Sequence, residues 1–317
     1  MTAEAPMTAP ATPLAPAIRP ARAKAGVDRW NGVVEVWLRA HAAVVYAFLY
    51  LPIIVVVLYS FNANRLATIW TGFSTQWYGI ALGDEVVQAA LLNSASVALP
   101  NAILATLFGT MAALGLQRVP KGVRIGFDAL TYVSIIVPEI VIALSTLVLF
   151  ASSFSAINDA TGLRLQLGIP TIVAAHMLFN ISIVLLLVRA RLSGMDRTLV
   201  EASYDLYASP WRTFRQITFP QLLPAIVAGF LLSFTFSFDD YVITSFVSGP
   251  GSSTLPIFIF GQVKTGVTPA TNAVATMMLF LTLLMLAAGQ FALTRNARRS
   301  GGGQAGGMAG MIAEQSG

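Results

Sequence analysis

Six runs of about 20 mostly apolar residues punctuate the chain, and each is long enough for one helix to cross the hydrocarbon core of a bilayer. They cover residues 41–60, 92–116, 127–150, 170–188, 222–246 and 273–293. Over 317 residues, 56% are hydrophobic and only 10% are charged, a balance that soluble domains do not have. The sequence therefore predicts an all-α membrane protein with six transmembrane helices.

The positive charges alternate between the loops that join these runs. Of the 19 Lys and Arg residues, all except Arg65, Arg164 and Lys264 lie before the first run, after the last, or in the loops between runs two and three and runs four and five. Since cytoplasmic loops carry the excess of Lys and Arg, we expect both termini in the cytoplasm. This placement accounts for the net charge of +5, so no nucleic-acid partner is expected.

The two ends of the chain have a different composition from its middle. Residues 1–38 begin with a Pro/Ala-rich stretch, and residues 297–317 are rich in glycine. Such segments bury too little apolar surface to offset the entropy lost on ordering, so we expect disordered cytoplasmic tails. The transmembrane domain is predicted to span residues 39–296. The absence of cysteine excludes disulfides and thiolate chemistry, and no catalytic or metal-binding residues are expected.

The cytoplasmic loop at 189–221 is predicted to hold two short amphipathic helices. Asp196 is placed to cap the first, and Ser209 followed by Pro210 is a typical start of the second. Apolar side chains then recur at helical spacing, at Trp211, Phe214 and Ile217. One interpretation is a pair of interfacial helices resting on lipid headgroups. The alternative is a docking element for a soluble partner, held by apolar packing with charged edges.

The same loop resembles the EAA loop of bacterial ABC importer permeases, whose pattern is EAA, three residues, G, nine residues and I-x-LP. The matching positions are Glu201, Ala202, Ser203, Tyr207, Ile217 and Pro220. The spacing agrees throughout, with departures at Ser203, Tyr207 and Phe219. The resemblance implies that this loop docks an ATPase subunit through those positions together with Asp205, Trp211 and Phe214. Tyrosine resists the left-handed conformation that glycine adopts at such a bend.

Residues 40–295 more specifically resemble the spermidine/putrescine permeases of that family, through "VPEIVIALSTLVLF" and "FTFSFDDYVITSFVSG" among other stretches. The resemblance implies half of the pore of an importer in the bacterial cytoplasmic membrane. It also implies a second permease subunit, ATPase subunits and an external solute-binding protein as partners, besides membrane lipid.

The chain lacks the parts needed to hydrolyse ATP itself. It contains no G-x-x-x-x-G-K-[ST] phosphate loop, and no glycine is followed by lysine anywhere. We therefore expect a transport subunit that is not an enzyme and has no cofactor, with ATP and Mg²⁺ bound by the partner ATPase.

Three carboxylates fall inside the predicted spans, at Glu139, Asp239 and Asp240. Each charge at the centre of a lipid-embedded helix costs roughly 2.5 to 3.5 kcal/mol, so such residues usually face a cavity or the bundle interior. As parts of continuous helices, Glu139 would lie near the midplane and Asp239 near the external mouth. The carboxylates, with Tyr241 nearby, are predicted to line the pathway of a cationic solute. The alternative is that they bond hydroxyl groups and hold helices together, and one of the adjacent pair could pair or cap locally.

Three other functions are alternatives to a polyamine importer. An ABC permease for another small organic solute would share all these features. A secondary transporter driven by an ion gradient would have no use for an EAA loop. Intramembrane aspartyl proteases resemble one another in a Tyr-Asp motif and a GxGD motif on neighbouring spans. Here the only Tyr-Asp pair, Tyr204-Asp205, lies in the loop predicted to be cytoplasmic, and no GxGD motif exists, so this function is disfavoured.

Overall fold

A computed structural model of the chain describes residues 25–66 and 69–314, with side chains over 34–66 and 69–291. It divides into two units, residues 1–55 and 56–317. Within the described residues, six helices are long and apolar enough to cross a membrane, as predicted. They are Val34–Tyr59, Glu85–Gly115, Glu139–Thr161, Ile169–Ser193, Pro210–Phe238 and Pro269–Phe291. In the first unit, α1 (Ala25–Tyr59) exposes its apolar side chains and carries an Arg39–Glu35 ion pair.

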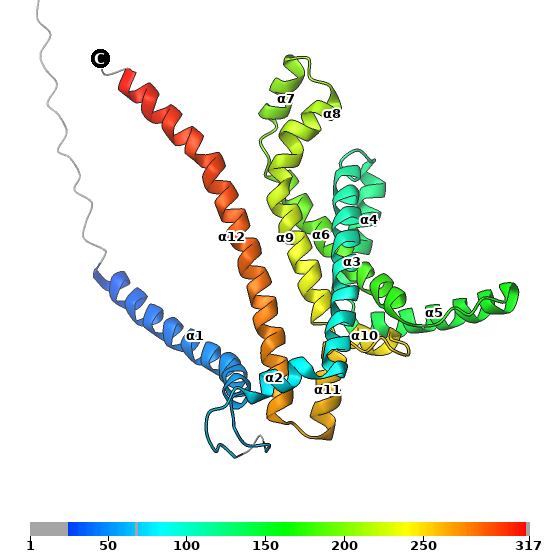
Figure 1. The fold of residues 1–317 in the computed structure, drawn as a ribbon. Coiled ribbons are helices and arrows are strands. Elements are labelled where there is room, and N and C mark those ends of the chain that lie inside the picture. The colour runs from blue at the N-terminus through cyan, green and yellow to red at the C-terminus, as the bar shows by residue number, and fades with distance from the viewer. Residues whose placement is uncertain (1–24, 67–68, 315–317) are drawn as a thin grey trace, which may run out of the picture. The chain divides into compact units, whose positions relative to one another are not determined.

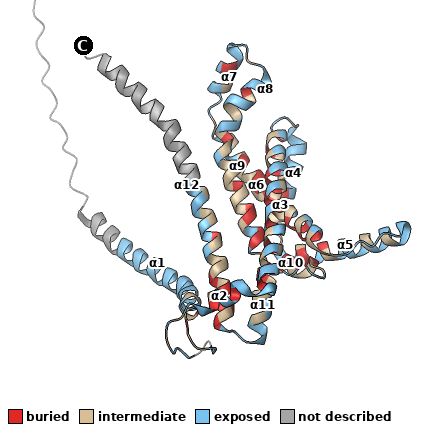
Figure 2. Cartoon of the chain, in the orientation of Figure 1, coloured by how far each residue is buried: buried red, intermediate tan, exposed pale blue. Residues whose placement is uncertain are grey.

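The second unit is built around a seam of three helices, α3 (Glu85–Gly115), α6 (Ile169–Ser193) and α9 (Phe219–Phe238), which lie side by side in Figure 1. Small residues bring their backbones together. A Cβ atom added at Gly109 of α3 would lie 2.7 Å from Val184 Cβ of α6, and one at Gly229 of α9 would lie 3.3 Å from the same side chain. Glycines let membrane helices approach this closely. Figure 2 shows that the buried residues concentrate along this seam.

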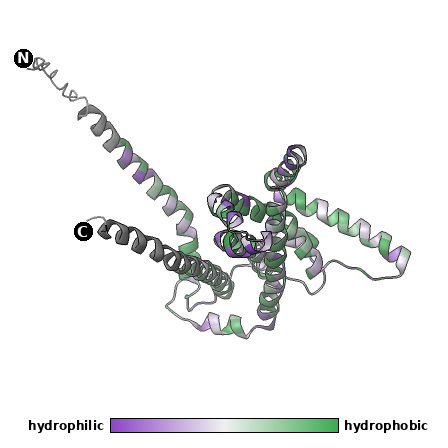
Figure 3. Cartoon of the chain, turned by 90° about the horizontal axis from the view of Figure 1, so that it is seen from above, coloured by the Kyte–Doolittle hydropathy of each residue, from purple (hydrophilic) through white to green (hydrophobic). Residues whose placement is uncertain are grey.

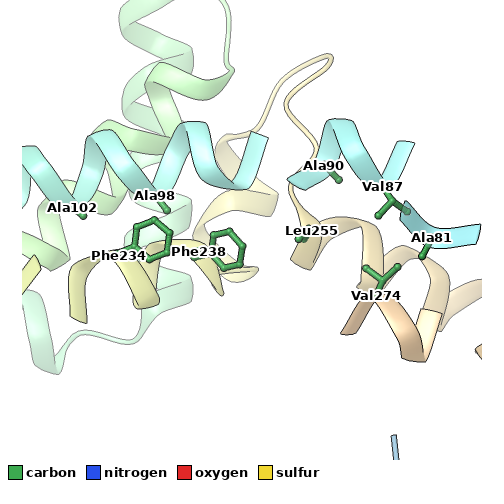
Figure 4. Packing of buried hydrophobic residues seen from close by; sticks show 9 residues of the cluster. All are labelled: Ala81, Val87, Ala90, Ala98, Ala102, Phe234, Phe238, Leu255 and Val274. Carbon is green, nitrogen blue, oxygen red and sulfur yellow. The ribbon is translucent and has the colours of Figure 1, made fainter. Parts of the chain in front are cut away.

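A second apolar cluster lies where α2 (Gln76–Gly83), α11 (Leu255–Thr265) and α12 (Pro269–Glu314) meet the seam. Phe234 and Phe238 stack at 5.5 Å between ring centroids, next to Ala98 and Ala102 of α3 (Figure 4). Figure 3 shows that hydrophobic residues dominate the helices of this unit. Because each long helix remains apolar on its outer faces, the unit suits a lipid environment.

The predicted third span is two helices in the structure. α4 (Lys121–Ile136) ends before Val137 and Pro138, and α5 (Glu139–Thr161) begins immediately after them. The cause is local, since a residue before proline is pushed out of the helical region, and Val137 has an extended ψ of 130°. Glu139 is therefore the first residue of α5. The midplane depth that a continuous helix would give it does not apply.

The predicted fifth span also breaks near its C-terminal end. α9 ends at Phe238, and a short helix, α10 (Val242–Val247), follows after Asp239, Asp240 and Tyr241. The Asp240 carboxylate accepts hydrogen bonds from the backbone N–H groups of Ile243 at 3.4 Å and Thr244 at 2.7 Å. It thereby satisfies donors that the first turn of α10 leaves free. The depth estimate for the Asp pair, which assumed one helix, is corrected in the same way.

The loop at 189–221 forms α7 (Thr198–Asp205), α8 (Pro210–Thr213) and a π-helical turn, η1 (Phe214–Thr218). Ser209 caps α8 through its hydroxyl, as predicted. The Asp196 carboxylate accepts from the Thr198 hydroxyl and N–H, and these bonds hold its pKa below the usual range. The chain stays helical through Pro220, since the π turn ends at Thr218 and α9 begins at Phe219.

Regular structure also extends into both predicted tails. α12 continues to Glu314, across most of the segment 297–317, and α1 begins at Ala25 within the segment 1–38. A helix that is already formed adds residues without a new nucleation cost, which composition alone does not register. The remaining part of the N-terminal segment lies outside the described residues.

Candidate functional site

The two helix breaks bring acidic residues from distant parts of the sequence together. Glu139 begins α5 at the first break, and Asp240 lies in the second, between α9 and α10. The two carboxyl groups interact directly. Since α10 packs on both α5 and α6, the breaks face the N-terminal half of α6 at His176.

His176 lies at the centre of a buried polar cluster. Its Nδ1 atom is 2.7 Å from Ser237 Oγ, and its Nε2 atom is 3.0 Å from Asp240 Oδ2 and 3.1 Å from Thr244 Oγ1. The side chain of His176 is only 1% exposed. This histidine joins α6 to both sides of the second break.

Asp240 is fixed by this cluster. Its side chain is 5% exposed, and the Thr244 hydroxyl donates to Oδ2 at 2.7 Å in addition to the two backbone N–H groups. A buried carboxylate is tolerated when several donors surround it. Of the alternatives open for the adjacent pair, Asp240 therefore shows local pairing and capping.

Asp239 has a different environment, although it is the next residue along the chain. It is exposed, and its one hydrogen bond comes from Thr282 Oγ1 of α12 at 3.4 Å. Tyr241 is half-buried and packs on Phe260 of α11, with ring centroids 4.1 Å apart. Lys264 Nζ lies 4.9 Å from the centre of the Phe260 ring. Asp239 is thus free to meet a solute, whereas Tyr241 is engaged by an aromatic partner.

Glu139 is exposed and lines a cavity of about 360 Å³ at the first break. Apolar side chains form the rest of the wall. They are Ile135, Ile136, Val137, Pro138, Ile142, Phe179, Phe236 and Ile243. The cavity therefore combines one carboxylate with aliphatic and aromatic surfaces.

The predicted docking segment presents most of its residues to solvent. Glu201, Ala202, Asp205, Trp211 and Pro220 are exposed. Ser203 is buried, where its hydroxyl shares a 2.9 Å hydrogen bond with Thr213 and joins α7 to α8. Phe214 and Ile217 are half-buried, and the Phe214 ring stacks on Trp211 at 5.7 Å.

Tyr207 takes the backbone conformation expected of the glycine it replaces. Its φ of 58° lies in the left-handed region, and its side chain is 97% exposed. The bend is completed by hydrogen bonds from the N–H of Tyr207 to the Tyr204 carbonyl and from the N–H of Ala208 to the Ser203 carbonyl. Tyrosine therefore preserves the turn geometry but bears the strain of a Cβ atom in that region.

Sequence reasoning did not identify Ser237, Thr244, Phe179 or Phe236 as site residues. Ser237, Asp240 and Thr244 follow one another at intervals of three and four residues, which would place them on one face of a continuous helix. In the structure they meet at His176 across the second break, and Phe179 and Phe236 carry no such signal. Among the described residues, no group of three or more His, Asp and Glu side chains could hold a metal ion.

Comparison with known proteins now identifies the class. Residues 105–299 match the model of the binding-protein-dependent transport system inner membrane component family, and the chain belongs to that family. It is thus a multi-pass permease subunit of an ABC importer, a transport component and not an enzyme.

Two relatives and one solved structure illustrate the likeness. The chain is 41% identical to the putrescine transport system permease protein PotI of Escherichia coli (strain K12), over 74% of this chain and 82% of that protein. It is 38% identical to the spermidine/putrescine transport system permease protein PotC of the same strain, over 78% and 89%. A chain of a bacterial ABC transporter that imports the polysaccharide alginate superimposes with a TM-score of 0.68 and 13% identity, over 84% and 99%. That last match concerns the fold alone.

Proposed function

We propose that this permease carries a polyamine, putrescine or spermidine, across the bacterial cytoplasmic membrane. The names of the relatives support this class of solute. The observation that carries the proposal is the pair of exposed carboxylates, Glu139 and Asp239, near a buried third, Asp240. A flexible polycation that leaves water needs anionic partners along its route.

The exposed and buried carboxylates have separate roles in this proposal. Glu139 and Asp239 meet the ammonium groups of the solute. Asp240 fixes the second break, so that the other two are held in place. Tyr241 lies beside this route, where its ring lines the approach to Asp239.

We further propose the assembly in which this chain works. Two permease subunits form the pore, an external binding protein delivers the solute, and ATPase subunits with bound ATP and Mg²⁺ dock on residues 196–219. The distribution of Lys and Arg supports an orientation with both termini in the cytoplasm. The exposed aromatic and acidic residues of α7 and α8 support the docking, including Glu201 and Trp211.

The solute route is tested by uptake of radiolabelled putrescine and spermidine with all partner subunits present at matched levels. Glu139→Gln and Asp239→Asn should each lower the uptake rate, since they remove a charge with little change in shape. Glu85→Gln, an exposed acidic residue at the start of α3, serves as the control. Wild-type rates in both test variants would refute the solute route.

The docking is tested by copurification of the ATPase with the Glu201→Lys variant. Reversal of this exposed charge should reduce ATPase retention and solute-stimulated ATP hydrolysis, while the six helices remain inserted. Glu85→Lys is the charge-matched control. Normal stoichiometry and stimulation in Glu201→Lys would exclude a docking role for this residue.

A further inference from the structure

The cavity at the first helix break is lined by apolar side chains and by one carboxyl group, that of Glu139. Its wall residues come from α4, α5, α6, α9 and α10, and Glu139 is the only ionisable side chain among them. A volume of about 360 Å³ lies at the small end of the range for ligand sites. A site of this size and composition suits a small ligand with an aliphatic body and one charged end.

The aromatic part of the wall is ordered. Phe179 of α6 and Phe236 of α9 form an edge-to-face pair, with ring centroids 5.8 Å apart and ring planes at 77°. Both helices belong to the seam that Val184 and its glycine neighbours hold together. The rings therefore keep their position relative to the carboxylate at the start of α5. The faces of such rings offer apolar surface on which the methylene groups next to an ammonium can pack.

The charged end of the cavity favours a positive ligand. The Glu139 carboxyl lies against that of Asp240, and Asp240 is fixed by His176 and Thr244. Glu139 is the carboxyl group that lines the cavity, and a cation beside it provides the opposite charge that favours its ionised form. An anionic or neutral ligand would provide no such partner.

We propose that this cavity binds one alkylammonium end of the transported solute, with the ammonium at Glu139 and the adjoining methylene groups against Phe179, Phe236 and Ile142. The inference rests on the proposed function and deepens it. It assigns a binding site within the permease itself, separate from the external binding protein. It also assigns two aromatic residues to the recognition of the aliphatic part.

Single cysteines test the charge of the site directly, since the natural chain has none. The variant Ile142→Cys, in the complete transporter in membranes, is treated with methanethiosulfonate reagents that carry either an ethylammonium or an ethylsulfonate group. The cationic reagent should react several-fold faster, and putrescine should slow the reaction. Glu139→Gln in the same background should abolish the preference for the cation.

Leu144→Cys is the matched control, because Leu144 lies on the same helix, is exposed and does not line the cavity. It should show neither the preference seen at Ile142 nor protection by putrescine. Equal reagent rates at Ile142→Cys, or a preference that persists in Glu139→Gln, would overturn the cation site.

The aromatic wall is tested separately. Phe179→Leu and Phe236→Leu keep apolar volume but remove the ring faces. Each should raise the concentration of solute-loaded binding protein needed for half-maximal uptake by about threefold or more, with less effect on the maximal rate. Unchanged half-saturation in both variants would remove these residues from the site.

These outcomes separate the site from the proposed function. Normal putrescine uptake together with equal reagent rates would overturn the cavity site and leave the proposed function intact. A preference for the cationic reagent in a chain that carries no polyamine would support the cation site and contradict the choice of solute.

Discussion

The two helix breaks of the second unit interrupt apolar runs of similar character, yet they are built differently. At the first, Pro138 separates α4 from α5 by its covalent geometry and leaves Glu139 exposed at a cavity. At the second, the chain contains no proline, and the Asp240 carboxylate starts α10 by accepting hydrogen bonds from its first turn. One break is made by the backbone, and the other depends on a buried side chain.

This difference shows that an acidic residue in an apolar run has no role fixed by its local sequence. Asp239 and Asp240 are identical neighbours, and only the second meets His176, more than sixty residues earlier. The partner on another helix decides which carboxylate is structural. The first break should therefore tolerate loss of its carboxylate, and the second should not.

The largest expected effect is on stability, from Asp240→Leu. The substitution leaves His176, Thr244 and the first turn of α10 without their acceptor, which should lower the free energy of unfolding by about 3 kcal/mol. Glu139→Leu should change it far less, because that side chain is exposed. Thermal unfolding of the purified transporter, followed by tryptophan fluorescence, measures both. Equal destabilisation by the two variants would erase the contrast between the breaks.

Thr244→Val sharpens the contrast on a smaller scale. Valine keeps the shape of threonine but cannot donate to Asp240 or contact His176 through a hydroxyl. The expected loss is about 1 to 2 kcal/mol of stability in the same unfolding measurement. Thr265→Val, at an exposed site whose hydroxyl bonds only within α11, should cost little. If Thr244→Val lowered stability no more than Thr265→Val, the cluster around His176 would not be what holds the second break.

Pro138→Ala addresses the first break, where function should suffer more than stability. Alanine permits α4 and α5 to join, which would rotate Glu139 away from the cavity. We expect a change in unfolding free energy of about 1 kcal/mol or less and a clear drop in putrescine uptake. Pro100→Ala, inside the continuous helix α3, is the control. Full uptake in Pro138→Ala would mean that the break is not needed to place the carboxylate.

The smallest effect is expected at a third interruption, the bend between α7 and α8, which turns at Tyr207 in the left-handed region. Tyr207→Gly should relieve about 1 kcal/mol of left-handed strain and lose part of that gain to the greater freedom of the unfolded chain. The net stabilisation should be about 0.5 kcal/mol. Tyr204→Gly, within α7, should destabilise by about 1 kcal/mol. Destabilisation by Tyr207→Gly would show that the exposed ring contributes contacts absent from this structure.

The sequence predicted the six spans and the two short cytoplasmic helices because length, hydropathy and capping residues act locally. It left open which aspartate would pair, since His176 gives no local sign of the partner it will meet. Pro138 indicated a possible helix break, but the apolar residues on both sides of it together have the length of one membrane span. The site at Glu139 required the meeting of five helices, which no spacing within one segment reveals.

The join between the 189–221 loop and the fifth transmembrane helix has a mechanical consequence. From Pro210 to Phe238 the chain forms 29 residues of unbroken helix, about 44 Å in length at 1.5 Å per residue. One end carries the exposed Trp211, and the other adjoins Asp239. A helix of this length is stiff, and it packs closely on Val184 of α6 at Gly229, about two-thirds of the way from Pro210 to Phe238. A push on one end is therefore converted into a tilt about that pivot, and the far end swings in the opposite direction.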